Sequence, residues 1–474
     1  FFVPIEEQRA YTTNPNFARQ FFPPALARLP QPIRVSFDKP DDVMRIVVLG
    51  GSAAMGEPEP AYAFSRILDV MLTRTYPDRK FEVINTGMAT INSHVVRLIA
   101  QECHKIQPDV VLIYMGNNEV VGPFGAGTVF GSYSPSLTLI RAGIWLRTFR
   151  LGQLIEDCAR WVGGDSQFVT EGQGMAMFRD QSVSADDDRL EKVYSHFDAN
   201  LRDIVRILRD SGTQVMVSTV GANLVDHSPF ASVFGQVGLE NPLAWVKLYA
   251  TAIGHLEAGE REDAVAAFEM ANRVDSTHAE SHFRLAHLYL ERGDTVSARD
   301  QFVRARDFDA LRFRVDSRLN DMIRRIGTEL NPRLVDAARV LGERDRSRIG
   351  LPGNDLFHEH VHLTFRGNYL VASAFADQLY PFISGRTHYW DEASAPPELP
   401  SLTVCEADLA LTAFDRYRLY ATVSGLMGRS PFTHQFDYLE KRKRINARVD
   451  SLRAAGTSFS GVGGSLRAYQ LATD

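Results

Sequence analysis

Short apolar runs alternate with amphipathic segments along the first half of the chain, and this rhythm predicts strands joined by helices. Four runs rich in Val, Ile and Leu have the length of buried strands, at residues 44–50, 81–87, 109–116 and 214–220. An apolar stripe at helical spacing predicts a helix over 188–210. Alternating strands and helices favour a parallel sheet, whose fifth strand we place near Leu334–Asp336. The predicted fold class is therefore α/β, a three-layer sandwich.

Three regions stand outside this rhythm. Residues 1–43 contain enough prolines to stop any long helix, so this N-terminal segment is expected to be irregular. The Gly-rich start of 121–187 indicates either a surface excursion or a lid over an active site. From Thr387 to the end we expect a helical C-terminal extension (387–474) with helices at 405–426 and 433–456, and it contains no motif tied to chemistry.

An internal repeat lies between these parts. Five residues recur at an offset of 34 positions: Gly259, Ala264, Phe268, Ala271 and Asp275 return as Gly293, Ala298, Phe302, Ala305 and Asp309. This period and these residues resemble the tetratricopeptide repeat. We therefore expect a helical insert at 243–330, which divides the main domain into residues 44–242 and 331–386. The insert either packs against the main domain or docks a partner, which includes a second copy of the chain.

Charge and cysteine content narrow the function classes. A net charge of −6 argues against a nucleic-acid binder that works by neutralising phosphates. Cys103, Cys158 and Cys405 lie too far apart for a zinc motif or a disulfide framework. No apolar run approaches the roughly 20 residues that span a bilayer. Because the chain begins with Phe1 rather than Met, we expect a removed signal peptide or membrane anchor and an extracytoplasmic location.

Ser52 is the first candidate functional residue. It follows Gly50 and Gly51 at the end of the strand predicted at 44–50, where open α/β folds place their ligands. A helix that begins there would direct free N–H groups and its positive dipole end at the same point. Ser52 is therefore either a nucleophile or a helix cap.

Two further strands end in groups that donate hydrogen bonds. The strand at 81–87 ends in Gly87, and the strand at 109–116 is followed by Asn118. An enzyme that transfers acyl groups needs such donors to hold a developing oxyanion, each worth about 3 kcal/mol of the barrier. Taken singly, Gly87 is a turn glycine and Asn118 a cap. Together, at neighbouring strand ends, they favour an oxyanion hole.

The segment around residue 360 supplies three histidines and a carboxylate: His358, Glu359, His360 and His362. In one interpretation His362 is a general base for Ser52. In the other, His358-Glu359-x-x-His362 is the H-E-x-x-H motif of zinc-dependent hydrolases, which needs both histidines one turn apart on a helix. Turn residues upstream and Thr364 downstream predict that the helix begins only after His362, which favours the general base.

Four blocks of the sequence resemble the SGNH (GDSL-like) hydrolase superfamily, and especially its bacterial branch with tetratricopeptide repeats. The blocks are Gly51-Ser52, Asn85-Thr-Gly87, Gly116-Asn-Asn118-Glu119 and Glu359-His-Val-His362-Leu-Thr-Phe-Arg-Gly367. The resemblance covers about residues 44–382 and implies a flavodoxin-like sandwich. It further implies Ser52 as nucleophile, His362 as general base, and an oxyanion hole made by the Ser52 N–H, the Gly87 N–H and the Asn118 amide. It implies an ester substrate, such as an O-acylated glycan or lipid, and no metal or organic cofactor.

The sequence departs from this superfamily in two places. Gly51 stands where the serine block usually has Asp, and Glu359 stands where the carboxylate before the histidine is usually Asp. The extra methylene of Glu359 must be absorbed if it is to orient His362, and Asp355 is the alternative third member of the triad. These departures are the basis of a second hypothesis, a catalytically decayed hydrolase domain that serves as a repeat scaffold.

Overall fold

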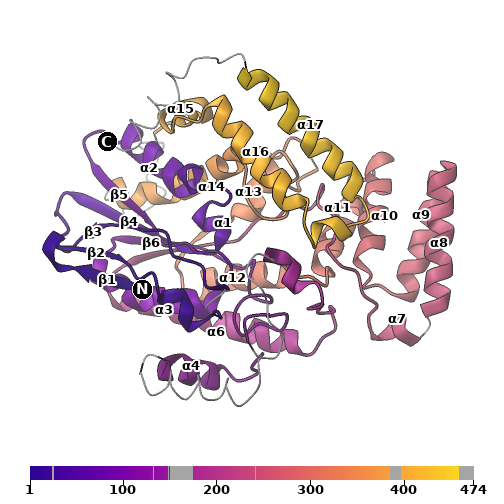
Figure 1. The fold of residues 1–474 in the computed structure, drawn as a ribbon, viewed down its shortest axis with the longest axis horizontal. Helices are drawn as coiled ribbons and strands as arrows, with labels where there is room; N and C mark the ends of the chain where they lie inside the picture. Colours follow the sequence, from indigo (N-terminus) through magenta and orange to yellow (C-terminus); the bar gives the residue numbers. More distant parts are fainter. Residues whose placement is uncertain are drawn as a thin grey trace.

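A computed structural model describes residues 1–23, 26–131, 133–147, 149, 174–240, 242–347, 349–384 and 397–457. Its centre is a five-stranded parallel sheet in the order β5-β4-β6-β7-β8 (Figure 1). The strands are β4 (Val43–Gly50), β5 (Lys80–Asn85), β6 (Val110–Tyr114), β7 (Gln214–Ser218) and β8 (Arg333–Val335). The five strands predicted from the sequence are confirmed. Gly50 at the end of β4 pairs with Tyr114 at the end of β6, so their carboxyl ends share one edge.

Helices cover both faces of this sheet and complete the predicted three-layer sandwich (Figure 1). One face carries α2 (Phe64–Thr75), α13 (Ala337–Arg344) and α14 (Phe365–Ser384); the other carries α3 (Ser93–Glu102), α6 (Arg189–Asp210) and α12 (Ser317–Glu329). Helix α6 matches the helix predicted at 188–210. Its apolar stripe is buried as predicted, so this face of the helix packs against the sandwich. The stripe consists of Val193, Phe197, Leu201, Ile204 and Leu208.

The N-terminal segment differs from the expectation. Residues 1–43 were expected to be irregular, but they include a small antiparallel sheet of β1 (Phe2–Ile5), β2 (Ala10–Thr13) and β3 (Val35–Ser36). The prolines do stop long helices, yet they leave room for short strands. Phe1 and Phe17 are buried in the main hydrophobic core, so burial of aromatic rings holds this segment on the domain.

Part of the predicted 121–187 lid can be located. Residues 137–146 form α4 (Leu137–Leu146), and a 3₁₀ turn covers Gly174–Phe178. Arg141 of α4 pairs with Asp203 of α6 at 2.8 Å, which places this helix beside α6. The stretch 150–173 lies outside the described residues, and the lid stays a prediction.

The repeat region forms paired helices with a hydrophobic cluster of their own. They are α8 (Pro242–Ala258), α9 (Arg261–Val274), α10 (Ala279–Glu291) and α11 (Thr295–Asp307), preceded by the short α7 (Gln236–Glu240). Gly259 and Gly293 join the helices of each pair with φ of 79° and 82°, a left-handed conformation that favours glycine. Phe268 and Phe302 are both fully buried. Equal offsets in the sequence therefore correspond to equal places in the structure.

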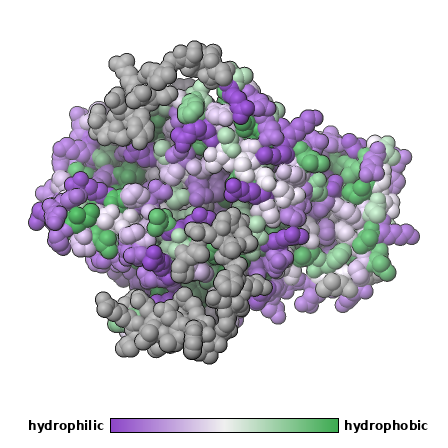
Figure 2. Space-filling view, in the orientation of Figure 1, coloured by the Kyte–Doolittle hydropathy of each residue, from purple (hydrophilic) through white to green (hydrophobic). Residues whose placement is uncertain are grey.

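The predicted boundary of the insert at residue 330 is wrong. Helix α12 lies within 243–330, but Leu319, Ile323 and Ile326 belong to the core of the sandwich, not to the cluster of α8–α11. Its amphipathic face packs against the sheet layer, so the insert ends before it. Hydrophobic residues show among hydrophilic ones at the end of the molecule formed by α8 and α9 (Figure 2). Docking of a partner on the insert stays a prediction.

The C-terminal extension is helical, as predicted, with one difference. The helix expected at 405–426 is divided into α15 (Leu402–Asp408) and α16 (Ala413–Met427), and α17 (Tyr438–Thr457) follows. Ala410 is left-handed at φ 50°, and Thr412 with Asp415 makes a capping box that starts α16. Among the helices that the structure describes, none is both long and apolar enough to cross a membrane.

Candidate active site

The chain turns sharply between β4 and the short helix α1 (Ser52–Met55), which presents Ser52 at the carboxyl edge of the sheet. A Cβ on Gly50 would collide with the Tyr114 carbonyl oxygen and the Ala54 side chain, so only glycine permits this close turn. Ser52 is the first residue of α1, where N–H groups have no partner within the helix. Within the described part of the chain the Ser52 N–H makes no hydrogen bond, so it is a candidate donor on the same residue as the hydroxyl.

The histidine segment forms a closed loop immediately before α14. Phe357 pairs with Leu363, and the His358 N–H donates to the His362 carbonyl at 2.8 Å. This loop directs His362 back to the sheet, where its Nε2 lies 2.9 Å from Ser52 Oγ. The structure thus brings together the predicted nucleophile and the predicted base, which are far apart in the sequence.

Glu359 is buried beneath the loop and contacts two histidines. One carboxylate oxygen contacts His362 Nδ1 and the other contacts His360 Nδ1. The same carboxylate accepts the N–H groups of His360, Val361 and His362 at 2.5, 3.3 and 3.1 Å. The side chain therefore folds over its own loop, and this absorbs the extra methylene that distinguishes Glu from Asp.

Asp355, the alternative third member of the triad, does not reach His362. It contacts Arg366 directly and lies 3.5 Å from Arg346. Both cations draw Asp355 to the outer side of the loop. In this structure Glu359, and not Asp355, contacts His362 Nδ1, and the third member of the triad stays a prediction.

Burial and the charge of Glu359 shift the pKa values of neighbouring histidines in opposite directions. Burial opposes the charged form of His362, but Glu359 and then Glu57 outweigh it and raise its pKa to about 9. Burial lowers the pKa of His358 to about 4 and also lowers that of His360. Although burial disfavours a charged Glu359, His360 and His362 hold its pKa well below the usual range. The pair thus consists of an ionised Glu359 and a basic His362.

The two oxyanion donors predicted outside the serine block, Asn118 and Gly87, differ in whether their N–H groups are free. Asn118 is partly exposed, its Nδ2 donates to the Ile91 carbonyl at 3.1 Å, and a Cβ on Gly51 would lie 3.0 Å from that Nδ2. The amide is therefore next to the residue that precedes Ser52. Gly87 is buried, and its N–H already donates to Asn85 Oδ1 at 2.9 Å. The prediction that Gly87 offers a free donor does not hold in this structure.

Glu119 secures the loop that carries Asn118. Its carboxylate is buried and accepts both the N–H and the hydroxyl of Ser93 at 2.8 Å, at the start of α3. Burial raises the pKa of Glu119 to about 7, although the bonds from Ser93 oppose this. The loop after β6 is thereby tied to α3, and Asn118 is positioned by it.

Sequence reasoning missed three residues at or behind the site. Glu57 Oε2 lies 3.5 Å from His362 Nε2, on the nitrogen that faces Ser52. Phe432, in the C-terminal extension, packs its ring on His360, and the nearby Gln435 contacts His227 Nε2 at 3.0 Å. A carboxylate a few residues after Ser52 was a usable signal for Glu57. No local signal pointed to Phe432 or Gln435.

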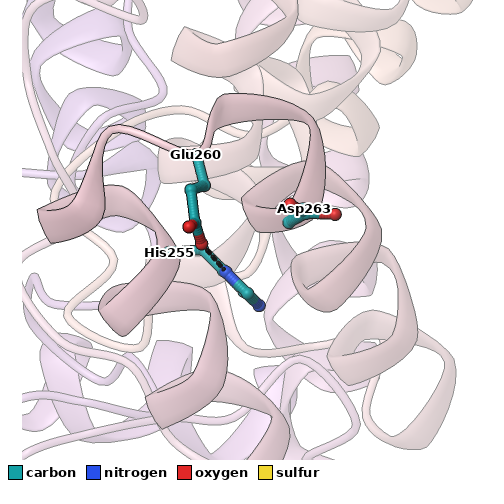
Figure 3. Close-up of side chains that lie close together, drawn as sticks. All are labelled: His255, Glu260 and Asp263. Carbon is teal, nitrogen blue, oxygen red and sulfur yellow. Dashed lines mark hydrogen bonds and ion pairs between the residues drawn. The ribbon is translucent and has the colours of Figure 1, made fainter.

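The zinc alternative lacks its geometry. His358 and His362 lie in the closed loop, because α14 begins only at Phe365. Among the described residues, the one group of side chains close enough to share a metal is His255, Glu260 and Asp263 on the insert (Figure 3). That group does not include either histidine of the motif.

No protein-family model and no curated protein matches the sequence. Solved structures with a similar fold include the acetyl xylan esterase AlAXEase, at 11% identity over 70% of this chain and 98% of that one, with a TM-score of 0.32. A lipolytic protein of the G-D-S-L family from Veillonella parvula aligns at 10% identity over 70% of this chain and 95% of that one, with a TM-score of 0.30. A lipase/acylhydrolase from Enterococcus faecalis aligns at 12% identity over 71% and 95%, with a TM-score of 0.30. This likeness concerns the fold alone.

Proposed function

We propose that the chain is a serine esterase of the SGNH type, which hydrolyses an ester through a Ser52 acyl-enzyme. One observation carries the proposal: His362 Nε2 lies 2.9 Å from Ser52 Oγ, while its Nδ1 contacts the buried Glu359. A serine becomes nucleophilic when a base takes its proton and a third group orients that base. Ser52, His362 and Glu359 contact one another in this order.

In this mechanism Ser52 Oγ attacks the ester carbonyl carbon while neutral His362 takes the serine proton. The negative charge that develops on the carbonyl oxygen is held by the Ser52 N–H and the Asn118 amide. The carbon–oxygen bond to the alcohol then breaks, and the alcohol leaves with the proton from His362. Water, deprotonated by His362, adds to the acyl-enzyme, and the acid leaves as Ser52 regains its proton.

The proposed substrate class is an O-acylated glycan or lipid, and the proposal includes an extracytoplasmic site of action and a protein partner on α8–α11. The competing hypothesis is a decayed domain that serves only as a scaffold. It drew support from Gly51 and Glu359, which both stand where the superfamily usually has Asp. The contacts of Glu359 with His362 weaken the second of these grounds and favour the enzyme.

A fluorophosphonate probe tests the proposal directly. The probe reacts with activated serines, so we expect the wild type to be labelled and Ser52→Ala to remain unlabelled, as read by intact-protein mass spectrometry. Circular dichroism of both proteins serves as the control for folding. A folded wild type that takes up no label would favour the scaffold.

The pH dependence of hydrolysis follows from the protonation of His362. Only the neutral imidazole accepts the serine proton, and Glu359 raises the pKa of His362 to about 9 against the effect of burial. We therefore expect kcat/KM to rise with pH through the neutral range and to level off above about pH 9. Initial rates with a p-nitrophenyl ester, corrected for spontaneous hydrolysis, measure this profile. A plateau already reached near pH 6.5, the ordinary pKa of histidine, contradicts it.

A further inference from the structure

A carboxylate that belongs to none of the four sequence blocks lies at the mouth of the site. Glu57 Oε2 is 3.5 Å from His362 Nε2, and Ser52 Oγ is 2.9 Å from the same nitrogen. The Glu57 side chain is 37% exposed, whereas His362 is 10% exposed and Glu359 is buried. Glu57 therefore faces the reacting atoms from the solvent side.

The backbone holds Glu57 in this place. The N–H groups of Gly56 and Glu57 both donate to the Ser52 carbonyl, at 2.9 and 3.1 Å. Gly56 is left-handed at φ 95°, and a Cβ there would collide with Ala63. The position of Glu57 is thus coupled to the residue that carries the nucleophile.

The ion-pair contact of Glu57 is with His362, the proposed base itself. Within the described part of the chain, no lysine or arginine pairs with Glu57. Glu59, two positions further on, lies 3.6 Å from Arg418 of α16, so its charge is offset. Glu359 is buried, and its carboxylate contacts His360 and His362. When His362 is neutral and acts as a base, Glu57 is therefore the uncompensated negative charge beside the bound substrate.

The proposed reaction brings the alcohol portion of the ester to this carboxylate. His362 Nε2 must deliver its proton to the departing alcohol oxygen, so that oxygen has to come within hydrogen-bond distance of the nitrogen that Glu57 flanks. A carboxylate accepts hydrogen bonds from hydroxyl groups, attracts cations and repels anions. The chemistry of the alcohol therefore decides whether Glu57 helps or hinders binding.

We propose that Glu57 is a specificity residue, which selects esters whose alcohol portion is a neutral polyol or a cation and disfavours an anionic one. This inference rests on the proposed esterase function and narrows its substrate. Acyl esters of neutral sugars fit the site. Acyl esters of uronates or of phosphate-bearing alcohols, with a negative charge near the ester oxygen, do not.

Two aryl acetates of matched shape test the selection, the neutral 4-acetoxybenzamide and the anionic 4-acetoxybenzoate. The ratio of their kcat/KM values is measured in the wild type and in Glu57→Gln, and dividing one ratio by the other cancels the intrinsic reactivity of each ester. We expect Glu57→Gln to favour the anionic ester by about 3- to 10-fold relative to the wild type, as for a screened charge a few Å away. About 0.5 M salt should reduce the difference.

Glu59→Gln is the matched control, because it removes a carboxylate from the same segment that is paired with Arg418, and its ratio should equal that of the wild type. The inference is overturned if Glu57→Gln leaves the ratio unchanged, or if Glu59→Gln changes it equally. A folded wild type that hydrolyses neither ester overturns the esterase proposal itself. Hydrolysis of both esters with an unaltered ratio overturns the selection alone.

Discussion

Ser52→Ala and His362→Ala are each expected to lower kcat for ester hydrolysis by about 10⁴- to 10⁶-fold, the range seen when a nucleophile or its base is removed from a serine hydrolase. The physical reason is the 2.9 Å contact between Ser52 Oγ and His362 Nε2. Without either side chain no acyl-enzyme forms, and the remaining donors only bind the ester. Release of p-nitrophenol from short p-nitrophenyl esters by the wild type and both variants measures the effect.

A zinc chelator completes this experiment. Activity that is unchanged by the chelator and absent from both variants supports the serine mechanism. The opposite pattern, with activity abolished by the chelator and retained in Ser52→Ala, would show that the histidine segment binds a metal. Thermal melts of the variants provide the control for folding, since Ser52 is partly exposed and its truncation removes little buried area.

Glu359→Gln is expected to lower kcat by about 10²- to 10⁴-fold and to move the pH profile to lower values. The negative charge of Glu359 is what raises the pKa of His362 against burial, so its removal lets that pKa fall. Glu359→Ala has a further effect, because it strips the partner from two histidines and three N–H groups. We expect it to lower the free energy of unfolding by about 3–5 kcal/mol. Kinetics across pH and urea denaturation separate the two effects.

Asp355→Asn is the matched control for Glu359→Gln. Both changes replace one carboxylate oxygen in the same loop, but Asp355 contacts Arg366 and Arg346 and not His362. We expect its kcat and pH profile to match those of the wild type. A loss in Asp355→Asn as large as that in Glu359→Gln would instead make Asp355 the third member of the triad.

The sequence was sufficient to place Ser52, Asn118 and His362 at one site, because each follows a strand or precedes a helix that its own neighbours define. Parallel strands end at the same edge, so residues after β4 and β6 had to meet. The start of α14 after His362 was also predicted, since Thr364 and Gly367 indicate where that helix begins. Sequence patterns were therefore informative about strand ends and helix starts, which neighbouring residues determine.

Other features depend on contacts between distant segments, which a pattern in one segment does not record. The choice between Glu359 and Asp355 depended on how Phe357 pairs with Leu363, and the approach of Glu57 to His362 joins two ends of the domain. Strand β5 ends at Asn85 rather than at the predicted Gly87, and the Asn85 side chain accepts the Gly87 N–H. Strand β3 is short and pairs with a segment far upstream, so its pattern was too weak to detect.

The separation of Ser52 from His362 has a consequence for the timing of synthesis. The two residues that must touch are 310 positions apart, and the loop of His362 is backed by Phe432 still later. A ribosome adds about 5–20 residues per second, so the proposed nucleophile exists for roughly 15–60 s before its proposed base has been made. During that interval β4, β5 and β6 are already present, but Ser52 is an ordinary alcohol. Under the proposed mechanism, a nascent chain is therefore inactive towards esters until residue 362 has been made and has folded onto the sheet.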